Sequence, residues 1–246
     1  MDQSSGWGDE ASQTFIDYGR YFVPEREHQF QIICQLIPKV SGTFSILELC
    51  CGEGMLAKVL LEHFPDCVIS GLDGSLTMLA KAKTNLSAYK ERFFGEQFDL
   101  LDSNWRKQKR NCLVVVSSLA IHHLDPDEKQ ELYQDIYRIL GPGGVFLVAD
   151  IIEPASHLGN ELAANEWDSC VRQRALEIDG NLDKFNIFEQ EAWNLYRHPD
   201  PDFDKPSPLL DQLKWLEAAG FSAVDVYWMK AGHAIFGGQK AKDIFT

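Results

Sequence analysis

Long apolar runs are missing from this sequence of 246 residues. No stretch reaches the roughly 20 consecutive apolar residues that a membrane-spanning helix needs, so no membrane partner is predicted. The N-terminus, MDQSSGWGDEAS, is acidic and polar, and it lacks the features of a signal or transit peptide. We therefore expect a cytoplasmic protein.

Paired cysteines are also missing. The six cysteines, at positions 34, 50, 51, 67, 112 and 170, form no Cys-x-x-Cys pair and no zinc-finger spacing. This pattern predicts reduced, mostly buried thiols rather than disulfides, and it predicts no metal site. A redox switch at the adjacent pair Cys50 and Cys51 is an alternative to two small buried residues.

Positive charge is scarce. The chain has 23 lysines and arginines against 37 aspartates and glutamates, which gives a formal net charge of −14. Because proteins hold polyanions largely through basic contacts to phosphates, this balance disfavours DNA or RNA as a partner.

What the sequence does contain is a regular alternation of apolar strands and amphipathic helices. Continuous apolar strands separated by helices indicate a mostly parallel sheet covered on both faces. The last two strands are separated by only a few residues, which predicts an antiparallel hairpin. The predicted strands are 44–49, 67–72, 92–98, 112–117, 145–150, 221–229 and 233–238.

Helix boundaries carry recognisable signals. Asp125, Pro126 and Glu128 form an N-cap, a first-turn proline and an N3 acid, and Gly141-Pro142 ends that helix. A second helix is predicted from Pro208, capped by Ser207, to Gly220.

Two segments lie outside the alternation. Residues 1–40 are predicted as an N-terminal helical cap, and residues 152–204 as a helical insertion after the fifth strand. The whole chain, 1–246, is predicted to be one domain, which its length allows.

The segment ELCCGEG joins the first strand to the next helix. Gly52 and Gly54 allow positive φ and close approach of the backbone to a ligand. The spacing differs from the Gly-x-Gly-x-x-Gly dinucleotide fingerprint, because position 57 is alanine. In an open parallel sheet, ligands bind beyond the carboxyl ends of the strands, where this loop lies.

Acidic residues occur at three successive strand ends. Glu48, Asp73 and Asp99 each lie at or just after one of the first three predicted strands. A single acid at such a place is usually a helix cap, whereas three at corresponding positions indicate a ligand site. An acid after the second strand is suited to hold ribose hydroxyls.

The ordered motifs ELCCGEG, GLDGSLTMLAKA, QFDLLDSNW, VVVSSLAIHHL and YRILGPGGVFLVAD resemble those of class I S-adenosylmethionine-dependent methyltransferases. The resemblance covers roughly residues 44–151, and the C-terminal hairpin also fits that fold. It implies a Rossmann-like α/β fold with a seven-stranded, mostly parallel sheet and an antiparallel C-terminal hairpin strand. It also implies S-adenosyl-L-methionine as cofactor and S-adenosyl-L-homocysteine as product.

The resemblance assigns the cofactor-binding residues. Glu48 would orient the methionine end, Asp73 would bind the ribose hydroxyls, and Asp99 with Leu100 would lie at the adenine. Cys50 stands where the family usually has glycine, and its Cβ narrows the backbone approach. The remaining residues assigned to this site are Arg26, Cys51, Gly52, Gly54, Gly74, Met78 and Ser118.

Catalytic residues are less defined, because the sulfonium already activates the methyl group. The protein must align a nucleophile, exclude water and in some cases remove a proton. His122 is a candidate base, with packing of the loop as the alternative interpretation. Tyr18 and Tyr21, in the segment that covers the cofactor in this fold, are candidates for excluding solvent.

The predicted reaction is methyl transfer to a small or medium organic acceptor, and the prediction allows a homodimer. One alternative is an enzyme like the carboxy-S-adenosylmethionine synthases of tRNA wobble-uridine modification, which need an arginine for the extra carboxylate. The insertion offers Arg172, Arg174 and Arg197. A non-catalytic cofactor-binding protein and a dinucleotide oxidoreductase are the other classes considered. SSLAIHHL stands where nucleic-acid methyltransferases carry an Asn-Pro-Pro-Tyr-type motif.

Overall fold

A mixed sheet of seven strands forms the centre of the molecule in a computed structural model that describes residues 8–108 and 111–242. The strand order is β3-β2-β1-β4-β5-β7-β6. The first five strands are parallel, and β7 runs antiparallel to both β5 and β6. The strands are β1 (Phe44–Leu49), β2 (Cys67–Asp73), β3 (Phe93–Gln97), β4 (Cys112–Ser118), β5 (Leu140–Ile151), β6 (Ser222–Lys230) and β7 (His233–Gln239).

Alternate residues of the central strands supply two hydrophobic cores. Ile46 belongs to the core under one face of the sheet, and the next residue, Leu47, belongs to the core under the other face. Val114 and Val115 divide in the same way. This alternation follows from the two-residue period of a strand, and it explains why both faces need helices.

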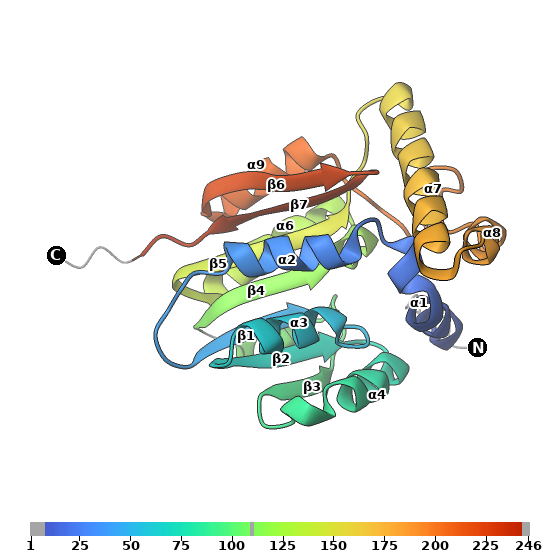
Figure 1. Ribbon diagram of the computed structural model, residues 1–246. Coiled ribbons are helices and arrows are strands. Elements are labelled where there is room, and N and C mark those ends of the chain that lie inside the picture. Colours follow the sequence, from blue (N-terminus) through green and yellow to red (C-terminus); the bar gives the residue numbers. More distant parts are fainter. Residues whose placement is uncertain (1–7, 109–110, 243–246) are drawn as a thin grey trace, which may run out of the picture.

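The helices cover the two faces in separate groups (Figure 1). The first core contains residues of α2 (Arg26–Leu36), α3 (Met55–His63) and α4 (Leu76–Asn85). The second contains residues of α5 (Asn104–Gln108), α6 (Pro126–Ile139) and α9 (Leu209–Ala219). Three-residue 3-10 turns, η1 (Ser87–Tyr89) and η2 (Ile121–His123), follow α4 and β4.

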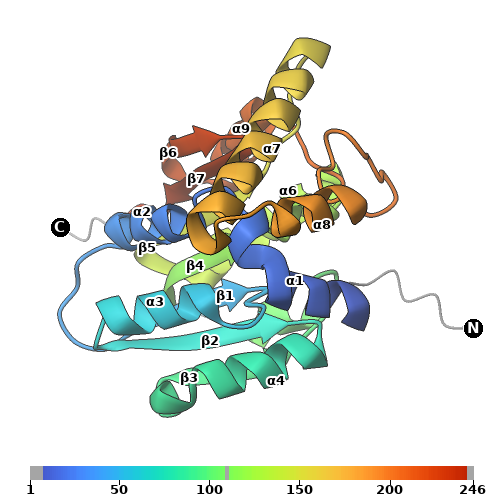
Figure 2. The ribbon, with the colours of Figure 1, turned by 45° about the vertical axis from the view of Figure 1, so that its right-hand side comes forward.

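A third hydrophobic core lies at one end of the sheet. Helix α1 (Asp9–Phe22) meets α7 (His157–Asp179) and α8 (Asp183–Gln190) there (Figure 2). Phe22 is fully buried among Phe188 and Trp193, and its carbonyl accepts a hydrogen bond of 2.7 Å from Trp167 Nε1. The N-terminal segment and the insertion after β5 therefore pack against each other.

The predicted strands and fold class are confirmed, and the boundaries differ in places. Strand β5 begins at Leu140 instead of residue 145, because Gly143 and Gly144 already exchange backbone hydrogen bonds with Lys240. Helix α6 carries the predicted capping box, and Gly220 ends α9 with a positive φ.

Two other boundaries need correction. Pro208 is the N-cap of α9, while Ser207 is buried and its hydroxyl accepts from Lys129. The insertion is helical only in α7 and α8, since the prolines at 199, 201 and 206 interrupt helix formation beyond them. Residues 1–7 of the predicted N-terminal cap lie outside the described residues. Among the described helices, none is long and apolar enough to span a membrane.

The packing of β7 against β5 leaves no room for a side chain at Gly237. A Cβ there would lie 2.1 Å from the carbonyl oxygen of Phe146. We expect Gly237→Ala to lower the free energy of unfolding by about 2–3 kcal/mol, since strands must separate to admit it. Urea unfolding measures this. Gly141→Ala, whose Cβ would lie 3.5 Å from its nearest neighbour, is the control, and equal losses in both variants would contradict the interpretation.

Candidate active site

The loop after β1 has an unusual backbone. Cys50, Gly52 and Gly54 all have positive φ angles, of 53°, 53° and 80°. The loop is held by a hydrogen bond from the Cys51 amide to the Leu72 carbonyl and by another from the Gly54 amide to the Cys51 carbonyl, each of 2.9 Å. Cys50 thus adopts a left-handed backbone conformation although it is not glycine. Its Cβ makes this conformation energetically costly, whereas glycine would adopt it without that cost.

Glu48, in β1, is buried beneath this loop. Its Oε2 has no hydrogen-bond partner among residues 8–108 and 111–242. Burial and the negative charge of Asp73 raise the pKa of Glu48 to about 8, although Arg26 and the Ala57 amide in the first turn of α3 act in the opposite direction. An unpartnered buried carboxylate oxygen is suited to receive a donor from a ligand.

Asp73, at the end of β2, connects the loop to the next strand. One carboxylate oxygen accepts from the Gly52 amide at 2.7 Å, and the other accepts from the Ser75 amide at 2.9 Å. Burial raises the pKa of Asp73, and the two amides oppose this shift. Each oxygen retains a lone pair, so Asp73 can also accept from a hydroxyl group.

Helix α1 and the start of α2 close over these residues. Ser12 of α1 is fully buried and donates to the Ser75 hydroxyl at 3.0 Å. Arg26 lies 4.0 Å from Glu53 and above the ring of Phe15. The N-terminal segment therefore brings one cation, Arg26, and one buried hydroxyl, that of Ser12, to the region of the glycine loop.

The structure brings most of the predicted cofactor residues together. Met78 is buried in the first turn of α4, and its Sδ lies 3.9 Å from where a Cβ at Gly52 would be. Gly74 immediately follows β2, and Ser118 ends β4 beside the site. Asp99 lies two residues beyond β3, is exposed, and accepts from the Leu101 amide. The intervening Leu100 carbonyl accepts from Arg106.

His122, in η2 after β4, is held between two carboxylates. Its Nδ1 is 2.5 Å from Asp150 Oδ1, and its Nε2 is 3.5 Å from Asp204 Oδ1. Burial by itself lowers the pKa of His122, but Asp150 and then Asp204 outweigh it and raise the pKa to about 9.

The two tyrosine candidates lie in the third core. The Tyr21 hydroxyl donates to Asp179 at the end of α7, and Tyr18 stacks on Phe22. Neither contact joins them to the glycine loop.

Some residues of the site were missed by sequence reasoning. Asp150 is the penultimate residue of β5 as Asp73 is the last of β2, so the strand-end rule could have identified it. Ser12 and Asp204 carry no sequence signal, because only folding brings them to Ser75 and His122.

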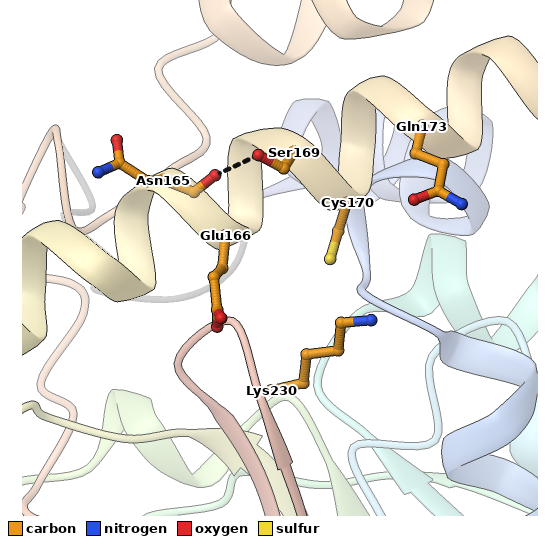
Figure 3. A pocket seen from close by; sticks show the side chains of 6 residues that line it. All are labelled: Asn165, Glu166, Ser169, Cys170, Gln173 and Lys230. Atoms are coloured by element: carbon orange, nitrogen blue, oxygen red, sulfur yellow. Dashed lines mark hydrogen bonds between the residues drawn. The ribbon is translucent and has the colours of Figure 1, made fainter.

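Two hollows lie near the insertion. One of about 200 Å³ is lined by Asp204 together with Leu195, Tyr196, Asn160, Glu153, Asp200 and the prolines 154, 199, 201 and 206. The other, of about 240 Å³, lies between α7 and the end of β6 and is lined by Asn165, Glu166, Ser169, Cys170, Gln173 and Lys230 (Figure 3). The first hollow reaches the carboxylate beside His122, whereas the second borders none of the predicted site residues.

Comparisons with known proteins agree with this fold. Residues 46–144 match the methyltransferase domain family. A carboxy-S-adenosyl-L-methionine synthase of Pseudoalteromonas atlantica is 24% identical over 225 residues, which cover 88% of this chain and 89% of that protein.

Solved structures show the same fold. An O-methyltransferase family protein of Burkholderia thailandensis has a TM-score of 0.63 at 15% identity, over 95% of this chain and 60% of that one. Human N-acetylserotonin methyltransferase in complex with S-adenosylmethionine has a TM-score of 0.56 at 15% identity, over 96% of this chain and 60% of that one. The chain therefore spans about three fifths of these two structures.

A parallel sheet with a glycine loop after β1 and acids at its strand ends is typical of Rossmann-like folds that bind nucleotide-containing ligands. The chain carries a methyltransferase domain over residues 46–144 and has the fold of class I S-adenosylmethionine-dependent methyltransferases, a class whose cofactor is S-adenosyl-L-methionine. The residues present fit that molecule, since Glu48 offers an unpartnered buried oxygen to a cationic group and Arg26 offers a cation to a carboxylate.

The left-handed conformation of Cys50 generates a prediction. Cys50→Gly should raise the free energy of unfolding by about 1 kcal/mol, because glycine adopts φ near 53° without a steric cost. The affinity of Cys50→Gly for S-adenosylmethionine, measured by calorimetry, should be unchanged or higher. Cys50→Ala retains the Cβ and should show no gain in stability. A large loss of affinity in Cys50→Gly would show instead that the thiol contacts the cofactor.

The raised pKa of Glu48 generates a second prediction. In the folded chain Glu48 holds its proton up to about pH 8, whereas its ordinary value is 4.5, so its contribution to stability falls as pH rises between these values. Glu48→Gln should therefore stabilise the cofactor-free chain by about 2–4 kcal/mol at pH 8 and leave it little changed at pH 4. It should also weaken cofactor binding.

Denaturant unfolding at the two pH values, with calorimetry at pH 8, measures both effects. Glu62→Gln, at an exposed glutamate of α3, is the matched control. A Glu48→Gln variant with the same pH dependence as the parent would contradict the assignment.

Proposed function

We propose that the chain transfers the methyl group of S-adenosylmethionine to a small or medium-sized organic acceptor. The observation that carries this proposal is the hollow of about 200 Å³ at the insertion, which is bounded by Asp204 beside the end of β4. Its volume is below the roughly 300–1,000 Å³ of ligand pockets in general, so it suits only the smaller organic molecules. Its carboxylates, Glu153, Asp200 and Asp204, disfavour a polyanion, as does the net charge of −14.

The cofactor roles follow from the contacts around the glycine loop. Glu48 and Arg26 would hold the methionine end, and Asp73 would accept from the ribose hydroxyls. Met78, Asp99 and Leu100 would border the adenine, with Ser118 near the methionine portion. When bound, the cofactor supplies a methyl group that is already electrophilic.

The remaining work of the protein is alignment and exclusion of water. Helix α1 covers the glycine loop through Ser12 and Ser75, which keeps solvent from the reacting atoms. Both ring nitrogens of His122 are engaged by carboxylates, so the ring has no lone pair ready to accept a proton. We therefore assign His122 to positioning the end of β4 rather than to general-base catalysis.

A carboxy-S-adenosylmethionine synthase-like activity is the second candidate, favoured by similarity along nearly the full length of one such enzyme. That reaction requires an arginine for the extra carboxylate. The insertion arginines are engaged elsewhere, since Arg172 lies 4.2 Å above the Phe185 ring, Arg174 pairs with Glu27, and Arg197 is 2.6 Å from Asp168. These contacts favour simple methyl transfer.

A turnover assay with labelled S-adenosylmethionine distinguishes methyl transfer from the synthase activity and from non-catalytic binding. The chain is incubated with S-adenosylmethionine labelled in its methyl group and with either a small-metabolite extract or total tRNA. We expect label in a small product and formation of S-adenosylhomocysteine. A cofactor heavier by one carboxyl group would establish the synthase alternative, labelled tRNA would exclude a small acceptor, and binding without turnover would indicate a non-catalytic protein.

The ribose assignment is tested by Asp73→Ala. We expect a loss of about 1.5–3 kcal/mol in affinity for S-adenosylmethionine, because charge-assisted hydrogen bonds to the ribose are removed. Calorimetry measures this, with circular dichroism to establish folding. Asp66→Ala, at an exposed acid just before β2, should bind as the parent does. An unchanged dissociation constant in a folded Asp73→Ala variant would exclude the assignment.

A further inference from the structure

Two histidines and one aspartate converge beyond the end of β4. His122 and His123 belong to η2, and Asp204 is the last residue of the insertion, beyond α8. One ligand atom from each of the three side chains lies within 4.8 Å of the others. Asp204 Oδ1 is 3.5 Å from His122 Nε2 and 3.3 Å from His123 Nδ1.

These separations suit a tetrahedral ion. Zinc lies about 2.0–2.2 Å from nitrogen and oxygen ligands, so neighbouring ligand atoms of a tetrahedral zinc site are about 3.3–3.5 Å apart. Both separations from Asp204 Oδ1 fall in this range.

Asp150 gives His122 the support that metal-binding histidines usually have. Its Oδ1 is 2.5 Å from His122 Nδ1, and its Oδ2 accepts from the His122 backbone amide at 3.1 Å. This pair fixes the ring so that Nε2 points to Asp204. A carboxylate on the far nitrogen of a histidine is the usual second contact of such ligands.

The chain around Asp204 is also held in place. The Lys205 amide donates to the His122 carbonyl at 2.8 Å, and the buried ammonium of Lys129 donates to the Lys205 carbonyl. The Phe203 ring packs on His123, with centroids 4.4 Å apart, and the Phe203 carbonyl lies 3.1 Å from His123 Nδ1, a contact that the ion would replace. The three side chains are therefore positioned before any ion arrives, which favours binding.

We propose that His122, His123 and Asp204 bind a divalent transition-metal ion of the zinc class, supported by Asp150. On binding, the ion displaces the proton that His122 Nε2 directs to Asp204, compensates the charge of Asp204 and of the buried Asp150, and connects the end of the insertion to the end of β4. Asp204 lines the hollow of about 200 Å³, so water or an oxygen of an acceptor can reach the fourth coordination position from there.

Metal content tests this proposal without measuring activity. The full chain, with any affinity tag removed, is treated with a chelator, dialysed, and titrated with Zn²⁺ by calorimetry and with Co²⁺ by visible spectroscopy. We expect one equivalent of each ion and the intense visible absorption of tetrahedral Co²⁺. Failure of the parent chain to bind either ion would overturn the proposal, whatever the variants do.

Variants then identify the ligands. Asp204→Asn and His123→Gln should each weaken Zn²⁺ binding at least ten-fold, while His63→Gln, at an exposed histidine of α3, should bind as the parent does. Thermal unfolding and calorimetry with S-adenosylmethionine on the same samples show whether the fold and the cofactor site remain. Parent-like Zn²⁺ affinity in both ligand variants would place the ion elsewhere and overturn the assignment.

Discussion

The parallel alignment of β1, β2, β4 and β5 places buried carboxyl groups together at the carboxyl ends of the strands, and the surrounding structure compensates for their burial. Glu48, Asp73 and Asp150 are each almost fully buried, where like charges repel more strongly than in water. Hydrogen bonds from two backbone amides stabilise the Asp73 carboxylate. The Asp150 carboxylate is stabilised by the ring of His122 and by two backbone amides. Glu48 receives the least compensation, which leaves an oxygen free for a ligand.

The same edge is covered by segments that are far apart in the sequence. Trp167 of α7 donates to the carbonyl of Phe22 in α1, while Ser12 reaches Ser75 at the start of α4. Ser12, Glu48 and Asp73 are all buried. Helix α1 therefore contacts both the glycine-loop side of the molecule and the insertion.

The segment that lines the hollow of about 200 Å³ is held by polar contacts as well as by the third core. Lys129 is buried and donates to the Lys205 carbonyl and the Ser207 hydroxyl, while burial lowers its pKa to about 8. The Tyr196 hydroxyl lies 2.6 Å from the Ile152 carbonyl and 2.8 Å from the Gly232 carbonyl. These contacts connect the segment after α8 to the sheet, so the wall of the hollow depends on buried hydrogen bonds.

The sequence by itself determined the sheet, its parallel part, the final hairpin and the acids at the strand ends. These features are local, because hydrophobic period, glycine position and capping residues are written into short stretches such as ELCCGEG and Asp125–Glu128. The tertiary structure alone decided which distant groups meet them. The hydrogen bond from Ser12 to Ser75 depends on the packing of α1. The contact between Asp204 and His122 depends on the path of the chain after α8. No periodicity encodes such contacts between distant segments, so they could not be read from sequence.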